Sequence, residues 1–75
     1  MPMKIWVEMT FPKDLKEEPI FYEMIKRFAV IPTIVEASFS TETGWAYLKL
    51  EGEEEELDKL FEYLTGKNII VDKRR

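Results

Sequence analysis

Large aromatic side chains occupy alternate positions in two short stretches of the sequence. Trp6 lies in IWVE at residues 5–8, and Trp45 and Tyr47 lie in TGWAYLKL at residues 43–50. Successive side chains of a strand point to opposite faces, so these aromatics share one face and their apolar neighbours share the other. Aromatic rings on a second face can stack on RNA bases, bury against another copy of the chain or hold a small ligand. These are the chemistries to be weighed.

Residue types that carry catalysis or bind metals are scarce. The 75-residue chain has no cysteine and no histidine, which removes thiol nucleophiles, disulfides and the commonest general base. The run Glu53–Glu56 cannot converge on one ion, because successive helical residues point about 100° apart. Its carboxylates suit the first turn of a helix, where the dipole favours them. Without a phosphate-binding glycine loop either, we expect no catalytic residue, no metal and no cofactor.

The charge balance disfavours nucleic acid as a partner. The formal net charge is −4 and the pI is about 4.8, whereas nucleic-acid binding usually needs a basic surface. The basic cluster Lys73-Arg74-Arg75 is expected to be a solvated terminus. No apolar run approaches the roughly 20 residues that span a membrane, and the N-terminus lacks signal-peptide features. We expect a cytoplasmic protein without membrane insertion.

Hydrophobic periodicity predicts the order strand, helix, strand, strand, helix, strand. The predicted ranges are 3–11, 19–29, 33–40, 45–51, 53–64 and 68–72. This order is that of the α+β, ferredoxin-like βαββαβ fold, in which two helices cover one face of an antiparallel four-stranded sheet. The other face of the sheet is open.

Prolines and glycines mark the expected ends of these elements. Pro19 suits the first turn of the first helix, and Pro32 is expected to end that helix region. Gly44 suits a hairpin, and Gly66 stands where a helix C-terminal glycine belongs.

The predicted topology places the first and third strands side by side in the centre of the sheet. Trp6 is then expected beside Trp45 and Tyr47, in an aromatic cluster large enough to mark a binding surface. The second and fourth strands form the edges, and the charged tail discourages pairing on the fourth. In the second strand, one face is expected to carry Val35, Ala37 and Phe39, and the other Ile34, Glu36, Ser38 and Ser40.

Residues 43–50 resemble the RNP1 strand of an RNA recognition motif. Gly44, Trp45, Ala46 and Tyr47 fit its pattern, and Trp6 resembles the stacking aromatic of RNP2. This resemblance implies single-stranded RNA binding through the aromatic face. The pattern's basic residue and third aromatic are replaced by Thr43 and Leu50. The open face sets Lys4 and Lys49 against Glu8, Glu36 and Glu51.

A second resemblance covers residues 3–72. The matching landmarks are Phe11, Pro19-Ile20, Arg27-Phe28, Thr33–Glu36, Gly44, Leu50–Gly52 and Tyr63-Leu64. In order and spacing they resemble a NIL domain, the ACT-like, ferredoxin-like regulatory domain at the C-terminus of methionine ABC importer ATPase subunits. NIL domains also occur fused to ferredoxin modules. We interpret residues 1–75 as a single NIL-like domain, expected to stand alone because no ATPase precedes it.

The NIL resemblance implies a non-enzymatic, homodimeric regulatory module that binds an amino acid such as methionine near the dimer interface. The motif that names the family reads Thr33-Ile34-Val35 here, so a hydroxyl replaces an asparagine amide. Aromatic side chains would contact the ligand, and Thr33 would hydrogen-bond to it. The candidate ligand-binding or interface residues are Trp6, Thr33, Ile34, Val35, Trp45 and Tyr47.

Two alternative functions stay open. The first is a purely structural dimerisation or docking module for a transporter or ferredoxin-type partner. The second is RNA binding of the kind seen in RNA recognition motifs. Ligand-dependent thermal stabilisation separates the regulator from the docking module, and fluorescence quenching by single-stranded oligomers tests RNA binding.

Overall fold

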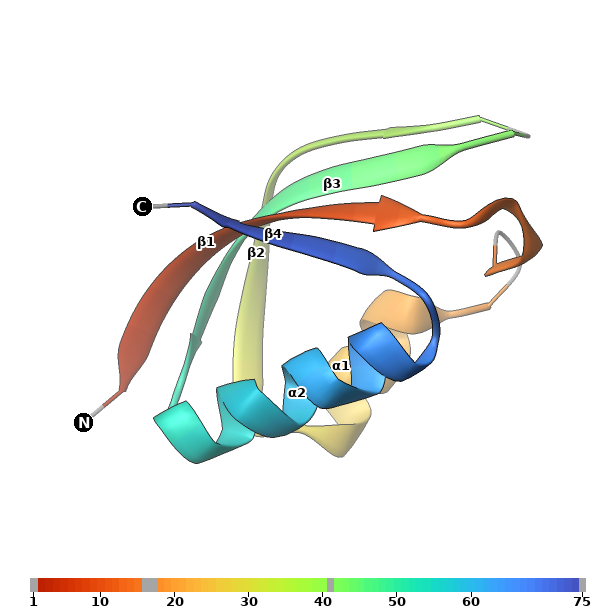
Figure 1. Ribbon diagram of the computed structural model, residues 1–75. Helices are drawn as coiled ribbons and strands as arrows, with labels where there is room; N and C mark the ends of the chain where they lie inside the picture. Colours follow the sequence, from red (N-terminus) through yellow and green to blue (C-terminus); the bar gives the residue numbers. More distant parts are fainter. Residues whose placement is uncertain (1, 16–17, 41, 75) are drawn as a thin grey trace.

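Two helices pack against one face of a four-stranded antiparallel sheet in the computed structural model (Figure 1). The strand order is β2-β3-β1-β4, as the ferredoxin-like topology predicts, with β2 and β4 at the edges. The structure describes residues 2–15, 18–40 and 42–74. Residues 16–17, between the first predicted strand and the first predicted helix, lie outside these ranges, as do Thr41 of the hairpin connection and Arg75 of the basic cluster. The predicted α+β fold is confirmed.

The elements follow the predicted order, with a short 3-10 helix, η1, added after the first strand. Their bounds are β1 (Met3–Phe11), η1 (Lys13–Leu15), α1 (Ile20–Arg27), β2 (Val30–Phe39), β3 (Gly44–Gly52), α2 (Glu54–Gly66) and β4 (Ile70–Arg74). None of the helices in the described residues is long and apolar enough to cross a membrane.

The core lies between the helices and the inner face of the sheet. Alternation in β1 and β3 places Val7, Met9, Leu48 and Leu50 there, each with 0% of its surface exposed. Both helices contribute their apolar stripes from the same side of the sheet. Their buried members are Ile20 and Met24 in α1 and Leu57, Leu60 and Leu64 in α2.

The first helix ends earlier than predicted. It stops at Arg27, and Phe28 already has extended backbone angles (φ −127°, ψ 146°). The expectation that Pro32 marks the end of the helix region is wrong, because Pro32 lies inside β2, which begins at Val30. A proline is tolerated there because β2 is an edge strand and leaves some of its N–H positions unpaired.

A bulge divides β2 into two halves. Ile34 pairs with Leu48, and Glu36 pairs with Tyr47, so Val35 is an extra residue. The extra residue reverses the alternation, and Ile34 therefore lies on the helix side with Leu48 instead of on the open face as predicted. Figure 1 shows the strong bend in the middle of β2, which is the usual consequence of a bulge.

The C-terminus of α2 is closed by asparagine instead of glycine. Asn68 has a positive φ of 64°, and no glycine in the described residues does. The N–H of Ile69 donates to the Leu64 carbonyl at 3.0 Å, and the N–H of Asn68 donates to the Thr65 carbonyl at 3.0 Å. This pair of bonds forms a Schellman motif with Asn68 in the left-handed position. Gly66 is an ordinary helical residue, which corrects its predicted role.

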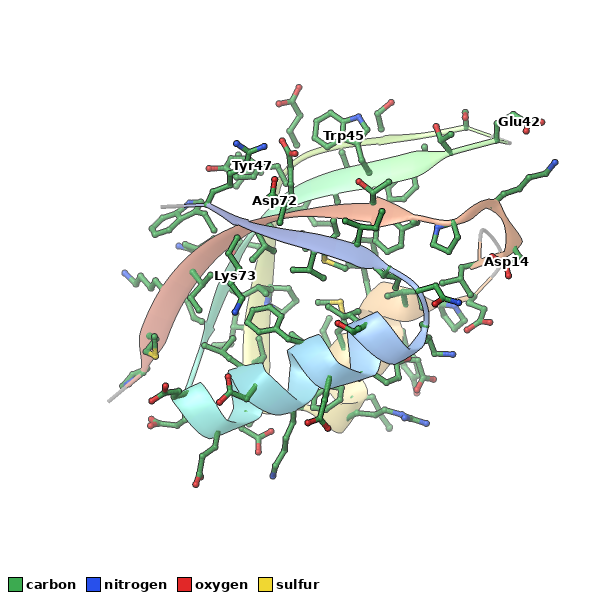
Figure 2. The ribbon with its side chains drawn as sticks, in the orientation of Figure 1. Asp14, Glu42, Trp45, Tyr47, Asp72 and Lys73 are labelled. Atoms are coloured by element: carbon green, nitrogen blue, oxygen red, sulfur yellow. The ribbon has the colours of Figure 1, made fainter. Side chains whose placement is uncertain are left out.

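The basic residues near the C-terminus are part of the sheet. Lys73 lies with its Nζ 4.6 Å from the centre of the Phe61 ring, on the side that faces α2 (Figure 2). Arg74 donates from Nη2 to Glu8 Oε1 at 3.0 Å across the open face. Both residues are exposed, as predicted for a solvated terminus, but they belong to β4 instead of a free tail.

Candidate functional site

An apolar pocket of about 270 Å³ opens where the β1–α1 connection meets the β2–β3 hairpin. Its aromatic wall consists of Phe11, Phe21 and Phe39, which come from β1, α1 and β2. Their ring centroids are 5.6 Å apart for Phe11–Phe39, 5.8 Å for Phe11–Phe21 and 6.3 Å for Phe21–Phe39. Leu15 and Ile20 extend the apolar lining. We call this site the phenylalanine pocket.

The rim of the phenylalanine pocket carries charges of both signs. Lys13 Nζ lies 3.5 Å from Glu42 Oε1, and both side chains are well exposed, at 68% and 71%. Figure 2 shows Glu42 on the β2–β3 hairpin, at the same end of the molecule as Asp14, the neighbour of Lys13. The other rim carboxylate, Glu18, accepts a hydrogen bond from Lys67 Nζ at 2.8 Å, which raises the pKa of Lys67.

The hairpin beside the phenylalanine pocket is held by its own hydrogen bonds. The Oγ of Ser40 accepts from the N–H groups of Glu42 at 3.2 Å and Thr43 at 3.1 Å. Gly44 follows, and a Cβ built on it would lie 2.5 Å from Cδ1 of Phe39. Because glycine has no side chain, it leaves room at this position for the Phe39 ring.

The predicted aromatic cluster on the open face is only partly formed. Trp45 and Tyr47 are neighbours on β3, and Figure 2 shows both on the side of the sheet away from the helices. In the register, however, Trp6 pairs with Lys49, while Thr10 pairs with Trp45. Trp6 is thus displaced along the sheet, and the expectation that it lies beside Trp45 is wrong.

A shallow hollow of about 190 Å³ lies over Trp45 and Tyr47 on the open face. Its other lining residues are Glu8, Glu36 and Arg74. The hydrogen bond from Arg74 to Glu8 raises the pKa of the Arg74 guanidinium, so this group stays charged. We call this site the open-face hollow.

The remaining candidate residues, Thr33, Ile34 and Val35, lie on the edge strand β2. All three are exposed, with 53% of Ile34 and 54% of Val35 accessible. None of them lines the phenylalanine pocket or the open-face hollow. The structure therefore distributes the candidate residues between the open face and one sheet edge.

The family model of the NIL domain matches residues 6–73 of the chain. The chain belongs to the NIL-domain family. No curated protein matches it. The family is one of small regulatory domains and not a catalytic one. In this NIL domain, the described residues hold no group of three or more acidic side chains that could bind a metal ion.

The phenylalanine pocket of this NIL domain was not predicted from the sequence. Phe11 and Phe39 are the last residues of β1 and β2 and face the core side of the sheet. Phe21 lies in the first turn of α1. Phenylalanines at the ends of elements that meet at one end of a sheet are the signal that could have indicated it. Read singly, each phenylalanine looks like an ordinary core residue.

Proposed function

We propose that this NIL domain is a homodimeric regulatory module that binds an apolar amino acid, such as methionine, in the phenylalanine pocket. The observation that carries the proposal is an aromatic-walled pocket of about 270 Å³ with an ion pair at its rim. Small-ligand sites are concave and mostly apolar, with a few polar groups that fix orientation. The volume lies just below the range for drug-sized ligands, so a small metabolite suits it.

An amino acid complements the rim charges. Its carboxylate can pair with Lys13 and its ammonium group with Glu42, while its side chain enters between the phenylalanine rings. Separating the Lys13–Glu42 pair costs little, because exposed ion pairs contribute only about 0–1 kcal/mol. A thioether gains sulfur–aromatic contacts of roughly 0.3–1.5 kcal/mol. Methionine therefore fits better than a polar amino acid.

The edge strand β2 supports the proposed dimer. It is 10 residues long and exposes apolar side chains at Ile31, Ile34, Val35 and Phe39. The opposite edge strand, β4, has 5 residues and carries Asp72, Lys73 and Arg74. Long apolar edges pair with other strands, whereas short charged edges resist pairing. We therefore assign Thr33, Ile34 and Val35 to the interface between two copies.

Phe39 provides the proposed link between ligand and dimer. Phe39 is 57% exposed and is the last residue of β2, and its ring contacts the rings of Phe11 and Phe21. A ligand that orders this ring would also order the end of the edge strand. Binding and dimerisation would then be coupled through the preference of the ligand for one state of β2.

Thermal melting with a panel of amino acids tests the proposed function. Methionine at ten times its dissociation constant should stabilise the fold by about 1.4 kcal/mol, or on the order of 5–10 °C. Glutamate and lysine should give no shift. Phe39→Ala should abolish the methionine shift, whereas Ile70→Ala, an exposed apolar control on the opposite edge strand, should keep it. If no amino acid shifts the melting temperature at millimolar concentration, the ligand-binding function is refuted.

The structural alternative makes a different prediction in the same experiment. A docking module for a transporter or ferredoxin-type partner would form dimers through β2 but would show no amino-acid-dependent shift. A dimer by light scattering combined with a flat melting panel would favour that function.

A further inference from the structure

The open-face hollow is built on one transverse row of side chains that crosses the sheet. In the strand register, Glu36 of β2 faces Tyr47 of β3, Tyr47 faces Glu8 of β1, and Glu8 faces Asp72 of β4. Paired residues of antiparallel strands share a face and lie about 4.5–5.5 Å apart at Cβ. Tyr47 is therefore flanked by a carboxylate on each side, and Trp45 adds a second ring next to it along β3.

Among the described residues, a cation neutralises only one end of this acidic row. Arg74 Nη2 lies 3.0 Å from Glu8 Oε1 and 3.5 Å from Asp72 Oδ2, so it relieves the repulsion between these two carboxylates. On the other side of Tyr47, Glu36 forms no ion pair within the part of the chain that the structure describes. Lys49, the nearest cation of the next row on β3, is 3.5 Å from Glu51.

The chemistry of the open-face hollow suits a guanidinium group. Arginine stacks on aromatic rings, binds carboxylates through two parallel hydrogen bonds and loses its hydration more easily than lysine. A cation over tryptophan or tyrosine gains further from the negative face of the ring. Arg74 shows that a guanidinium already lies at this hollow, against Glu8. The opposite side of the hollow also has an aromatic ring, Tyr47, and a carboxylate, Glu36, but no cation of the described residues pairs with that carboxylate.

We propose that the open-face hollow docks an arginine side chain of a basic segment on a partner protein, with Trp45 and Tyr47 as the stacking surface and Glu36 as the anion. A second copy of the chain is a poor occupant, because its open face presents the same carboxylate row and its Arg74 is already held by Glu8. Nucleic acid is also disfavoured, since Glu8, Glu36 and Asp72 would face its phosphates. This site is separate from the phenylalanine pocket and does not depend on the proposed amino-acid binding.

Tryptophan fluorescence tests the docking site. In a Trp6→Phe variant of the full chain, Trp45 is the remaining tryptophan, since the sequence has 2. We expect a saturable change in its fluorescence with the peptide acetyl-Gly-Arg-Arg-Gly-amide. The matched citrulline peptide, which has nearly the same shape without the charge, should bind at least fivefold more weakly. An equal response to both peptides, or no saturable response, overturns the proposal.

Charge-matched variants separate the hollow from general attraction to an acidic protein. Glu36→Gln should weaken binding of the arginine peptide at least fivefold, whereas Glu55→Gln on the exposed surface of α2 should leave it unchanged. Arg74→Gln should strengthen binding, because it frees Glu8. Equal effects of Glu36→Gln and Glu55→Gln contradict the assignment. A saturable response to single-stranded oligouridylate but not to the arginine peptide would assign the face to nucleic acid instead.

Discussion

Gly44 and Phe39 together determine the shape of the phenylalanine pocket. A methyl group on residue 44 would stand 2.5 Å from Phe39 Cδ1 and 2.9 Å from Cε1, so the ring must move. The ring is exposed enough to rotate away, and we expect Gly44→Ala to cost no more than about 1–2 kcal/mol of stability. Methionine should no longer raise the melting temperature of this variant. An unchanged methionine shift would show that the ligand binds elsewhere.

Asn68 and Gly66 should respond to substitution in opposite directions. Asn68→Ala places alanine, whose side chain cannot hydrogen-bond locally as that of asparagine can, in the left-handed region. This change should destabilise the fold by about 1 kcal/mol. Asn68→Gly should not. Gly66→Ala should stabilise by about 0.5–1 kcal/mol, because a Cβ there meets nothing within 4 Å and alanine favours the helix. Urea unfolding measures all three, and a destabilised Gly66→Ala would contradict the helix end described above.

Glu56 should make stability depend on pH in the acid range. Its carboxylate accepts a hydrogen bond from the Ala29 N–H at 3.0 Å, and this bond, helped by Lys59, lowers the pKa of Glu56 from its ordinary value. A lowered folded-state pKa stabilises the fold above the ordinary value, and the effect is lost as the pH falls through the lowered pKa. The difference in melting temperature between the wild type and Glu56→Gln should therefore be largest near pH 7 and vanish in acid.

The neighbouring exposed carboxylate provides the control for this pH dependence. Glu55→Gln removes a charge from the same helical turn without touching the hydrogen bond to Ala29. It should therefore not reproduce the pH-dependent difference in melting temperature. If the Glu56→Gln difference stays constant from pH 7 to pH 3, the hydrogen bond to Ala29 does not hold the start of α2.

Sequence periodicity predicts the burial of individual residues well only where the pattern of apolar and polar residues is regular. Val7, Met9, Leu48 and Leu50 alternate without interruption, and all are buried as expected. Asn68 was missed because glycine is the stronger signal for a left-handed helix end, and Gly66 stands two positions earlier. The displacement of Trp6 from Trp45 depends on the register between strands, which alternation along one strand does not specify.

The exposed edge of β2 is the element on which the proposed dimer depends. Val35→Lys places a charge at the bulge of this edge, and charged edge residues block strand pairing. We expect the variant to be a monomer of 9.0 kDa by light scattering, while the wild type has twice that mass. Ile70→Lys, which changes an exposed apolar residue of the opposite edge strand, should remain a dimer. If the wild type is a monomer at high concentration, the proposed interface at β2 is wrong.

The central strand β1 and the edge strand β2 show why some elements were easier to predict than others. β1 has the predicted bounds, because its alternating pattern is bounded by Pro12. In β2, Pro32 suggested a boundary, yet the strand begins before it since an edge strand accepts a proline. The bulge at Val35 depends on pairing with β3, and its one mark in the sequence is the apolar Ile34 in a set that is otherwise polar.

At the scale of the whole molecule, the proposals use three separate surfaces. The phenylalanine pocket lies at one end of the sheet, the proposed dimer edge is β2, and the open-face hollow lies on the side away from the helices. Phe39 connects the first two, and Glu36 lies on the same strand as the second. A regulatory domain of this design could receive a ligand, pair with a second copy and still present one face to a partner protein.

The most direct test of the central claim is amide NMR of the full chain titrated with methionine. We predict that the signals that shift belong to residues around the phenylalanine pocket, among them Leu15, Phe21, Ser40 and Gly44. Signals of Trp45 and Tyr47 should stay in place. Saturable shifts confined to the open face, or no shifts at millimolar methionine, would contradict the assignment of the phenylalanine pocket as the regulatory ligand site.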